Sequence, residues 1–364
     1  MLLPIIVLLF FIALYILYDT TPSINNKRDI RLFCGFCAFL LLQLLRVYCQ
    51  LSFPDIPNYR QVFCGIKPLY YVLENNGQGL DYYETGEITQ IDFGYRIFVS
   101  LIKCFTNNYE FFLLIVSVIE LISLKLFCNK FDVSPFIIMP IYVAMTYTAF
   151  QIGMLRQALA FCLFLAALCQ INKKWIFFSL ILLGCFFHKS MVFCFLLFWC
   201  NAKIKLKYVN IIFIISLIIY LLKIDFVSQY WLILDIEDLN RVNHYLKTGV
   251  DSSFLGIGFW ERIILYSLMV ISFKNLIIRN KTTNSLIVFF NLGICVILLQ
   301  MFFFASPSIT SRLRYYIVIF PMLYLLLYAH YHISKYKIKF MLYLPISMYL
   351  LMYMFTQSGY LTEL

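Results

Sequence analysis

Apolar runs of about twenty residues recur along most of this chain, and their length limits its fold more than any other feature. A helix of roughly 17–25 mainly apolar residues crosses the hydrocarbon core of a bilayer. Of the 364 residues 63% are hydrophobic and only 13% are charged, against about 25% charged in soluble domains. Too few polar side chains remain to cover a water-soluble globule. The sequence therefore predicts an integral membrane protein and argues against soluble enzymes and nucleic-acid-binding proteins.

These runs predict an all-α fold, a polytopic bundle of about 10–12 transmembrane segments forming one integral-membrane domain over residues 1–364. Lysine and arginine cluster between the runs, as they do in cytoplasmic loops, so the net charge of +11 reflects topology. Both termini and two larger periplasmic loops, residues 52–91 and 224–258, then lie outside. The runs are Leu2–Tyr18, Leu32–Gln50, Tyr109–Phe127, Ser134–Phe150, Leu155–Ile171, Tyr208–Lys223, Phe259–Phe273, Ser285–Phe304, Leu313–Ala329 and Phe340–Phe355.

Two further segments do not fit a simple crossing. Phe93–Phe105 is too short to span, so we expect an interfacial or re-entrant helix on the outer side. Residues 175–200 have basic clusters at both ends and are broken near the middle by Gly184 and His188. We expect a broken or re-entrant hairpin, whose irregular tip must be buried in protein or line a wet cavity.

Ionisable side chains within apolar runs are costly and usually face a partner or a cavity. We expect Arg46, near the end of its run, to reach the lipid headgroups, and Glu120 to form half of an ion pair between helices. Arg156 lies where two runs turn at the outer face, and His188 lies at the tip of the neighbouring hairpin.

Cationic side chains gather at the outer level of the membrane: Arg156, Lys189, Arg312 and Arg314. Such charges need counter-charges, which the acidic residues of loop 52–91 or an anionic substrate could supply. A planar guanidinium binds phosphate oxygens through two parallel hydrogen bonds, which suits a lipid diphosphate. Arg312 and Arg314 also fit a simpler role as anchors to lipid headgroups.

Tyrosines, including Tyr59 and Tyr95, are frequent in and just after the first outer loop. Aromatic residues favour the membrane interface in any membrane protein. Together with carboxylates and amides they also form sugar-binding surfaces, in which rings pack on sugar faces and side chains bind hydroxyls. Both interpretations stay open from the residues alone.

Short motifs follow one another in a fixed order between residues 46 and 320. They are Asp55-Ile56-Pro57-Asn58-Tyr59-Arg60, Asp92-Phe93-Gly94-Tyr95, Arg156-Gln157-Ala158, Phe187-His188-Lys189-Ser190 and Arg312 followed by Tyr315-Tyr316. Their order resembles that of the EpsG/Wzy-type polysaccharide polymerases of bacterial surface-glycan assembly. Asp92 departs from the pattern, in which glutamate is more usual.

The resemblance implies a multi-pass glycosyltransferase of the bacterial inner membrane whose active site faces the periplasm. It would join undecaprenyl-diphosphate-linked oligosaccharide repeat units of O-antigen, capsule or exopolysaccharide, without cofactor or metal. The implied partners are these lipid-linked oligosaccharides, the bilayer, a chain-length regulator and a flippase, and no nucleic acid.

The resemblance also suggests roles for the residues. His188 would be the general base, with Asp55 and Asp92 as alternatives. Charge on the diphosphate would be stabilised by arginine and lysine, and the glycan would be held by tyrosine. The proposed binding residues are Arg156, Arg312, Arg314, Lys189, Tyr59 and Tyr95.

Other functions remain possible from the sequence. One alternative is another lipid-linked-sugar glycosyltransferase, of the GT-C class, and a second is a ligase that moves finished glycan. The GT-C class typically has a paired-acid motif in its first outer loop, which Asp81-Tyr82-Tyr83-Glu84 imitates only loosely. A flippase for lipid-linked oligosaccharides would have matching halves, and the sequence shows none. A membrane scaffold would not need arginines at the outer level.

Overall fold

The described residues of the computed structural model are 2–20, 37, 40–44, 46, 56–80, 83–84, 87–88, 92–151, 153–224, 256–304, 310, 314–333, 343 and 345–354. Most of them are helical, which confirms the all-α part of the predicted fold class. The chain divides into two compact parts. Unit 1 comprises Met1–Phe195 and Leu344–Leu364, and unit 2 comprises Leu196–Tyr343. The single membrane domain over residues 1–364 stays a prediction.

Unit 1 begins with α1 (Leu2–Thr20), which packs against α7 (Pro135–Tyr142). Ser134 caps α7, because its hydroxyl accepts a hydrogen bond from the amide of Phe136 at 3.3 Å. The chain continues from α7 into the π-helix η3 (Val143–Gln151). This wider coil is rare, and it is frequently found at functional sites.

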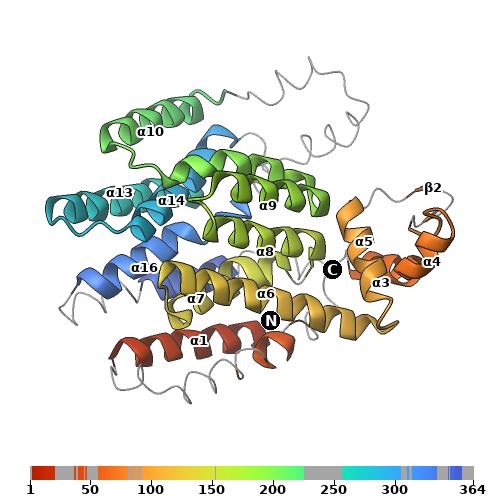
Figure 1. Cartoon of the computed structure of the whole chain (residues 1–364). Helices are drawn as coiled ribbons and strands as arrows, with labels where there is room; N and C mark the ends of the chain where they lie inside the picture. Colours follow the sequence, from red (N-terminus) through yellow and green to blue (C-terminus); the bar gives the residue numbers. More distant parts are fainter. Residues whose placement is uncertain are drawn as a thin grey trace. The chain divides into compact units, whose positions relative to one another are not determined.

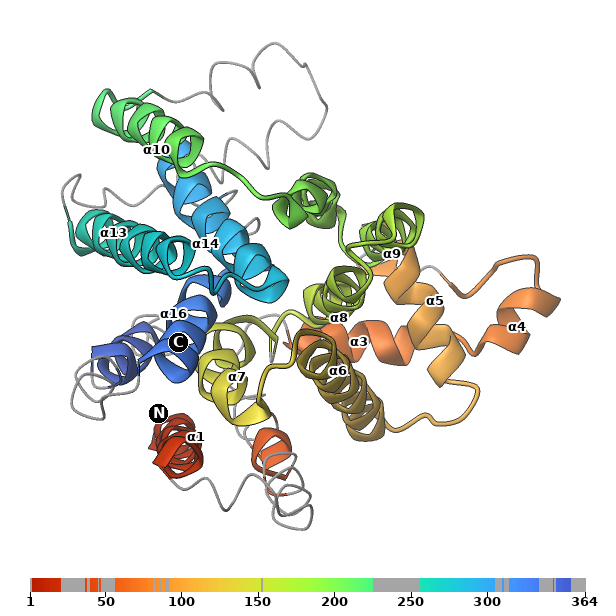
Figure 2. The same cartoon turned by 60° about the vertical axis from the view of Figure 1, so that its left-hand side comes forward.

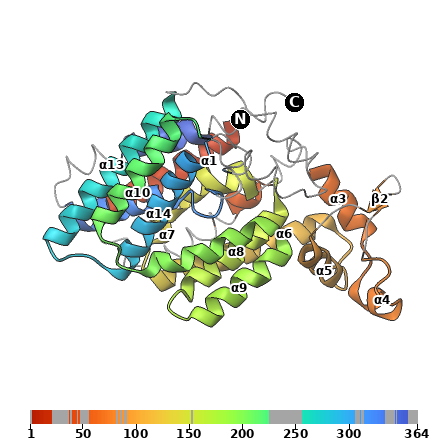
Figure 3. The same cartoon turned by 90° about the horizontal axis from the view of Figure 1, so that it is seen from above.

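The central helices of unit 1 are α6 (Tyr109–Phe131), α8 (Leu155–Cys169) and α9 (Lys174–Phe187). Helix α8 packs against both α6 and α9, as Figures 1 and 3 show, and most of its side chains are buried. The short helix predicted from Phe93 is α5 (Phe93–Ile102), and it packs against α9. Its ten residues are too few to span a bilayer.

The described part of residues 52–91 contains helices and a small ribbon. Helices α3 (Ile56–Gly65) and α4 (Leu69–Glu74) precede the antiparallel strands β1 (Tyr83–Glu84) and β2 (Glu87–Ile88). Each strand has only two residues, so the ribbon leaves the all-α class unchanged. Helix α3 buries one face against α5, α6 and α8 (Figure 2). The buried cluster consists of Tyr59, Val62, Phe63, Ile66, Tyr95, Val99, Ile102, Tyr109, Phe112, Leu113, Val116, Leu155 and Leu159.

The helical path through residues 175–200 is interrupted at His188. Helix α9 ends at Phe187, the backbone of His188 is extended, and the 3₁₀ helix η4 (Lys189–Asn201) follows. A 3₁₀ helix of 13 residues is unusually long. The re-entrant hairpin itself stays a prediction.

The described part of unit 2 contains the helices α10 (Leu206–Leu221), α13 (Ile257–Ile278), α14 (Asn284–Phe302) and α16 (Phe320–His332). Helix α14 packs against the other three. The apolar run from Leu313 predicted an earlier start for α16, which in fact begins at Phe320. Pro321 explains the difference, because proline fits the first turn of a helix and not its interior.

Among the described residues, α6 and α14 are long and apolar enough to cross a membrane, judged by length and composition. Shorter apolar helices, 10–17 residues long, accompany them in both units. These apolar helices are compatible with a membrane protein. The periplasmic placement of residues 52–91 and 224–258 stays a prediction.

Candidate active site

An ion pair between Arg156 and Asp92 lies at the centre of the candidate site. Arg156 is the second residue of α8, and Asp92 directly precedes α5. Arg156 Nη1 donates a hydrogen bond to Asp92 Oδ2 at 2.8 Å. The two side chains are 29% and 10% exposed, so the pair is accessible to a ligand yet partly shielded from water. Two motifs 64 residues apart thus form one charged group.

Tyr59 of α3 is the third member of this group. Its hydroxyl accepts a hydrogen bond from Arg156 Nε at 3.3 Å, and the guanidinium lies 6.0 Å from the centre of its ring. The Tyr95 ring meets the Tyr59 ring edge to face at 5.7 Å. Tyr95 has no exposed surface, so its ring supports Tyr59 and presents no face to a sugar in this structure.

Close backbone contacts hold α5 in place. A Cβ atom on Gly94 would lie 2.8 Å from the carbonyl carbon and oxygen of Phe186 in α9, so glycine is required there. At the other end of α5, Lys103 Nζ donates hydrogen bonds to the carbonyl oxygens of Phe63, Cys64 and Ile66 at 2.9, 3.1 and 2.6 Å. Lys103 thereby ties α5 to the C-terminal end of α3.

Electrostatics at the site favour a basic carboxylate. Burial raises the pKa of Asp92 above its ordinary value, although Arg156 and Lys189 both act to lower it. Asp92 is therefore a stronger base than an exposed aspartate, while Arg156 keeps its carboxylate oriented.

The contact between α5 and α9 brings Lys189 near Asp92, and His188 directly precedes Lys189 in the chain. Phe187, the last residue of α9, packs against the buried cluster and lies 6.2 Å from the Phe98 ring. Lys189 is exposed and close enough to influence Asp92 electrostatically. His188 Nδ1 lies 2.6 Å from Ser190 Oγ and also accepts a hydrogen bond from the Ser190 amide at 3.3 Å.

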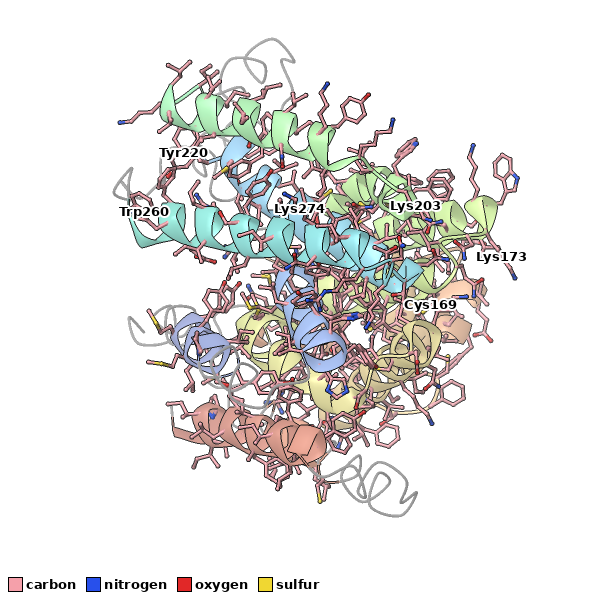
Figure 4. The ribbon with its side chains drawn as sticks, turned by 90° about the vertical axis from the view of Figure 1, so that its left-hand side faces the viewer. Cys169, Lys173, Lys203, Tyr220, Trp260 and Lys274 are labelled. Atoms are coloured by element: carbon pink, nitrogen blue, oxygen red, sulfur yellow. The ribbon has the colours of Figure 1, made fainter. Side chains whose placement is uncertain are left out.

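Of the two late arginines in the sequence prediction, the structure describes Arg314. Arg314 lies in unit 2 near Arg262, whose guanidinium sits 5.8 Å from the centre of the Tyr220 ring. Figure 4 shows Tyr220 and Lys203 at opposite ends of unit 2. Arg262 was not among the predicted site residues. Its charge within the apolar run Phe259–Phe273 was a signal that could have identified it. Asp55 and Arg312 lie outside the described residues.

Arg46 and Glu120 form a separate, fully buried ion pair. Arg46 Nη2 donates to Glu120 Oε1 at 2.7 Å, and the side chains are 1% and 2% exposed. Arg46 also donates to the Ser117 hydroxyl and to the Leu113 carbonyl oxygen, and its guanidinium lies 5.4 Å from the centre of the Tyr147 ring. The ion pair predicted for Glu120 is confirmed, and the headgroup contact predicted for Arg46 is wrong.

Within the described ranges, no group of three or more histidine, cysteine, aspartate or glutamate side chains could hold a metal ion. The chemistry available at the site is that of a carboxylate, a guanidinium, an imidazole, an ammonium group and a phenol. This set suits acid–base catalysis and the binding of phosphate.

Comparison with known families gave one result that covers most of the chain. The sequence model of the EpsG family matches residues 32–362. Searches of curated proteins and of solved structures gave no match. The matched range contains every residue of the site described above.

Proposed function

Because the chain belongs to the EpsG family, we propose that it is a membrane glycosyltransferase that polymerises a polysaccharide from lipid-linked repeat units. The family is associated with polymerase activity of this kind. The proposed donor is a glycan on undecaprenyl diphosphate, and the reaction takes place at the periplasmic face of the bacterial inner membrane. The finished polymer would be O-antigen, capsule or exopolysaccharide.

The Asp92–Arg156 ion pair is the observation that supports this proposal most directly. The pair is neutral at rest. When Asp92 accepts a proton, its charge disappears and the guanidinium of Arg156 is left with an unbalanced positive charge. That charge arises as negative charge develops on a departing diphosphate, so proton uptake and leaving-group stabilisation reinforce each other.

The proposed step breaks one glycosidic bond and forms another. A hydroxyl oxygen of the acceptor sugar attacks the anomeric carbon of the donor, and its proton passes to a base. The bond from the anomeric carbon to the diphosphate oxygen breaks, and its electron pair leaves with the diphosphate. Arg156 and Lys189 stabilise that charge, and Tyr59 orients Arg156. His188 and Asp92 are the described candidates for the base.

The partners follow from this reaction. The substrates are undecaprenyl-diphosphate-linked oligosaccharides held in the bilayer. A flippase would deliver each repeat unit, and a chain-length regulator would limit the polymer. Arg314, with Arg262 beside it, is a further candidate for contact with lipid phosphate.

A bacterium that lacks this gene provides the test. We expect its surface glycan to carry a single repeat unit, so that the ladder of longer chains is absent from a gel. The wild-type gene should restore that ladder. Asp92→Asn and Arg156→Gln should fail to restore it, with losses of about 10²–10⁴-fold and 10²–10³-fold in rate. The matched controls Glu110→Gln and Arg279→Gln alter exposed residues and should restore it fully.

The same gel distinguishes the alternatives. Loss of even the single repeat unit would indicate a flippase or an earlier glycosyltransferase. Loss of all glycan from its final acceptor, with polymer still present on the lipid carrier, would indicate a ligase. An unchanged ladder in the deletion strain would overturn the polymerase proposal.

A further inference from the structure

The position of Ser190 fixes the protonation pattern of the His188 ring. The backbone amide of Ser190 donates a hydrogen bond to His188 Nδ1 at 3.3 Å. An amide nitrogen can donate a hydrogen bond and cannot accept one, so Nδ1 must supply its lone pair. A neutral imidazole carries one proton, which in this arrangement lies on Nε2.

The Ser190 hydroxyl strengthens the same preference. Its oxygen lies 2.6 Å from His188 Nδ1, a distance typical of a good hydrogen bond. Because Nδ1 acts as an acceptor, the hydroxyl is the donor. Two donors from one residue thus meet the only ring nitrogen of neutral His188 that has a lone pair.

We propose that Ser190 is a positioning residue that holds His188 as its Nε2–H tautomer, so that His188 donates a hydrogen bond to the leaving diphosphate and Asp92 serves as the base. This inference rests on the proposed function. A general base needs a free lone pair directed at the substrate hydroxyl. The lone pair of His188 is bound by Ser190, whereas the Asp92 carboxylate has oxygen lone pairs beyond the one that binds Arg156.

The reaction then has a defined proton path. The proton of the acceptor hydroxyl passes to the Asp92 carboxylate as the new bond to the anomeric carbon forms. The electron pair of the broken bond moves to the diphosphate oxygen, where His188 Nε2–H and Arg156 stabilise it. His188 keeps its proton throughout.

Nitrogen NMR of the purified full-length protein tests the tautomer without any substrate. The chain has only four histidines, so ¹⁵N-histidine labelling gives few signals, and His188→Gln identifies those of His188. We expect the wild-type signals of a protonated Nε2 and an unprotonated Nδ1. Ser190→Ala should shift the ring toward a mixture of tautomers, and Ser190→Thr, which keeps the hydroxyl, should restore the wild-type pattern. A proton on Nδ1 in the wild type would overturn the inference.

Kinetics with a lipid-linked repeat unit test the roles. The amide nitrogen of glutamine can replace Nε2–H as a donor but cannot accept a proton. We therefore expect His188→Ala to lower kcat by about 10²–10³-fold. His188→Gln should retain much of the kcat that His188→Ala loses. Equal losses in the two variants would show that His188 is the base. His330→Gln is the matched control and should leave the rate unchanged.

The two measurements separate failure of the inference from failure of the proposed function. A wild-type protein that does not polymerise the repeat unit contradicts the function, whatever tautomer the NMR shows. A wild-type protein that polymerises but carries its histidine proton on Nδ1 contradicts the inference alone.

Discussion

At the scale of single residues, burial turns Asp92 into a better base than aspartate normally is. Asp92 must be ionised to accept a proton, so the reaction rate should fall as the pH drops through its pKa. Burial raises that pKa, so the loss should begin at a higher pH than an ordinary aspartate would give. Initial rates of polymerisation measured at a series of pH values show where this acid limb lies.

Lys189→Gln tests whether Asp92 is the group whose titration produces the acid limb. The ammonium group of Lys189 lowers the pKa of Asp92, so its removal should move the acid limb to higher pH. An acid limb that stays in place would exclude Asp92 as the titrating group.

The buried pair of Arg46 and Glu120 permits a second residue-scale prediction. Glu120→Ala leaves a buried guanidinium without its carboxylate and should destabilise the protein by about 3–5 kcal/mol. The double variant Arg46→Met/Glu120→Leu removes both charges and should recover most of that stability. Thermal unfolding in detergent measures both variants. A double variant less stable than Glu120→Ala would contradict the explanation.

At the scale of helices, the close contact between α5 and α9 sets the geometry of the site. Gly94→Ala would place a methyl group 2.8 Å from the backbone of Phe186, so one helix must move. Asp92 lies two residues before Gly94, and we expect kcat to fall at least tenfold, by analogy with the effect of a misplacement of about 1 Å. Gly258→Ala is the matched control, because its methyl group would make only an ordinary contact with Arg262. Equal rates for both variants would argue against this role of Gly94.

Helices with long apolar runs were predictable, and helix α3 was not recognised. The starts of α1, α6 and α14 agree within one residue with their apolar runs, because length and hydropathy alone define such helices. Helix α3 is short and has only one apolar face, formed by Tyr59, Val62 and Phe63, and Ile66 directly after the helix continues the same spacing. That pattern was present, but the polar residues around it suggested a loop.

The candidate site was predictable in part for a similar reason. Charges in or beside apolar runs drew attention to Arg156 and His188, and a motif drew attention to Asp92. The partners of these residues depend on tertiary contacts between distant segments. The bond from Arg156 to Asp92, the burial of Tyr95 and the pairing of Arg46 with Glu120 therefore required the structure.

At the scale of the whole molecule, the proposed topology places α3 and α5 outside the cytoplasm. Cys64 at the end of α3 and Cys104 after α5 are exposed. We expect a membrane-impermeant maleimide to label them in spheroplasts, and Cys64→Ser/Cys104→Ser to reduce the label. A cysteine introduced by Lys174→Cys should react only after permeabilisation. The opposite pattern would invert the topology.

The Arg46–Glu120 pair also has a consequence for how the chain is made. A ribosome adds about 5–20 residues per second, so the 74 residues that separate the partners take about 4–15 s to synthesise. Until Glu120 is made, Arg46 has no carboxylate partner, and inserting such a charge into the membrane costs about 2.5–3.5 kcal/mol. Once α6 has been synthesised, Glu120 can form the ion pair with Arg46. We therefore expect the segment with Arg46 to enter the lipid stably only after the segment with Glu120 has been translated.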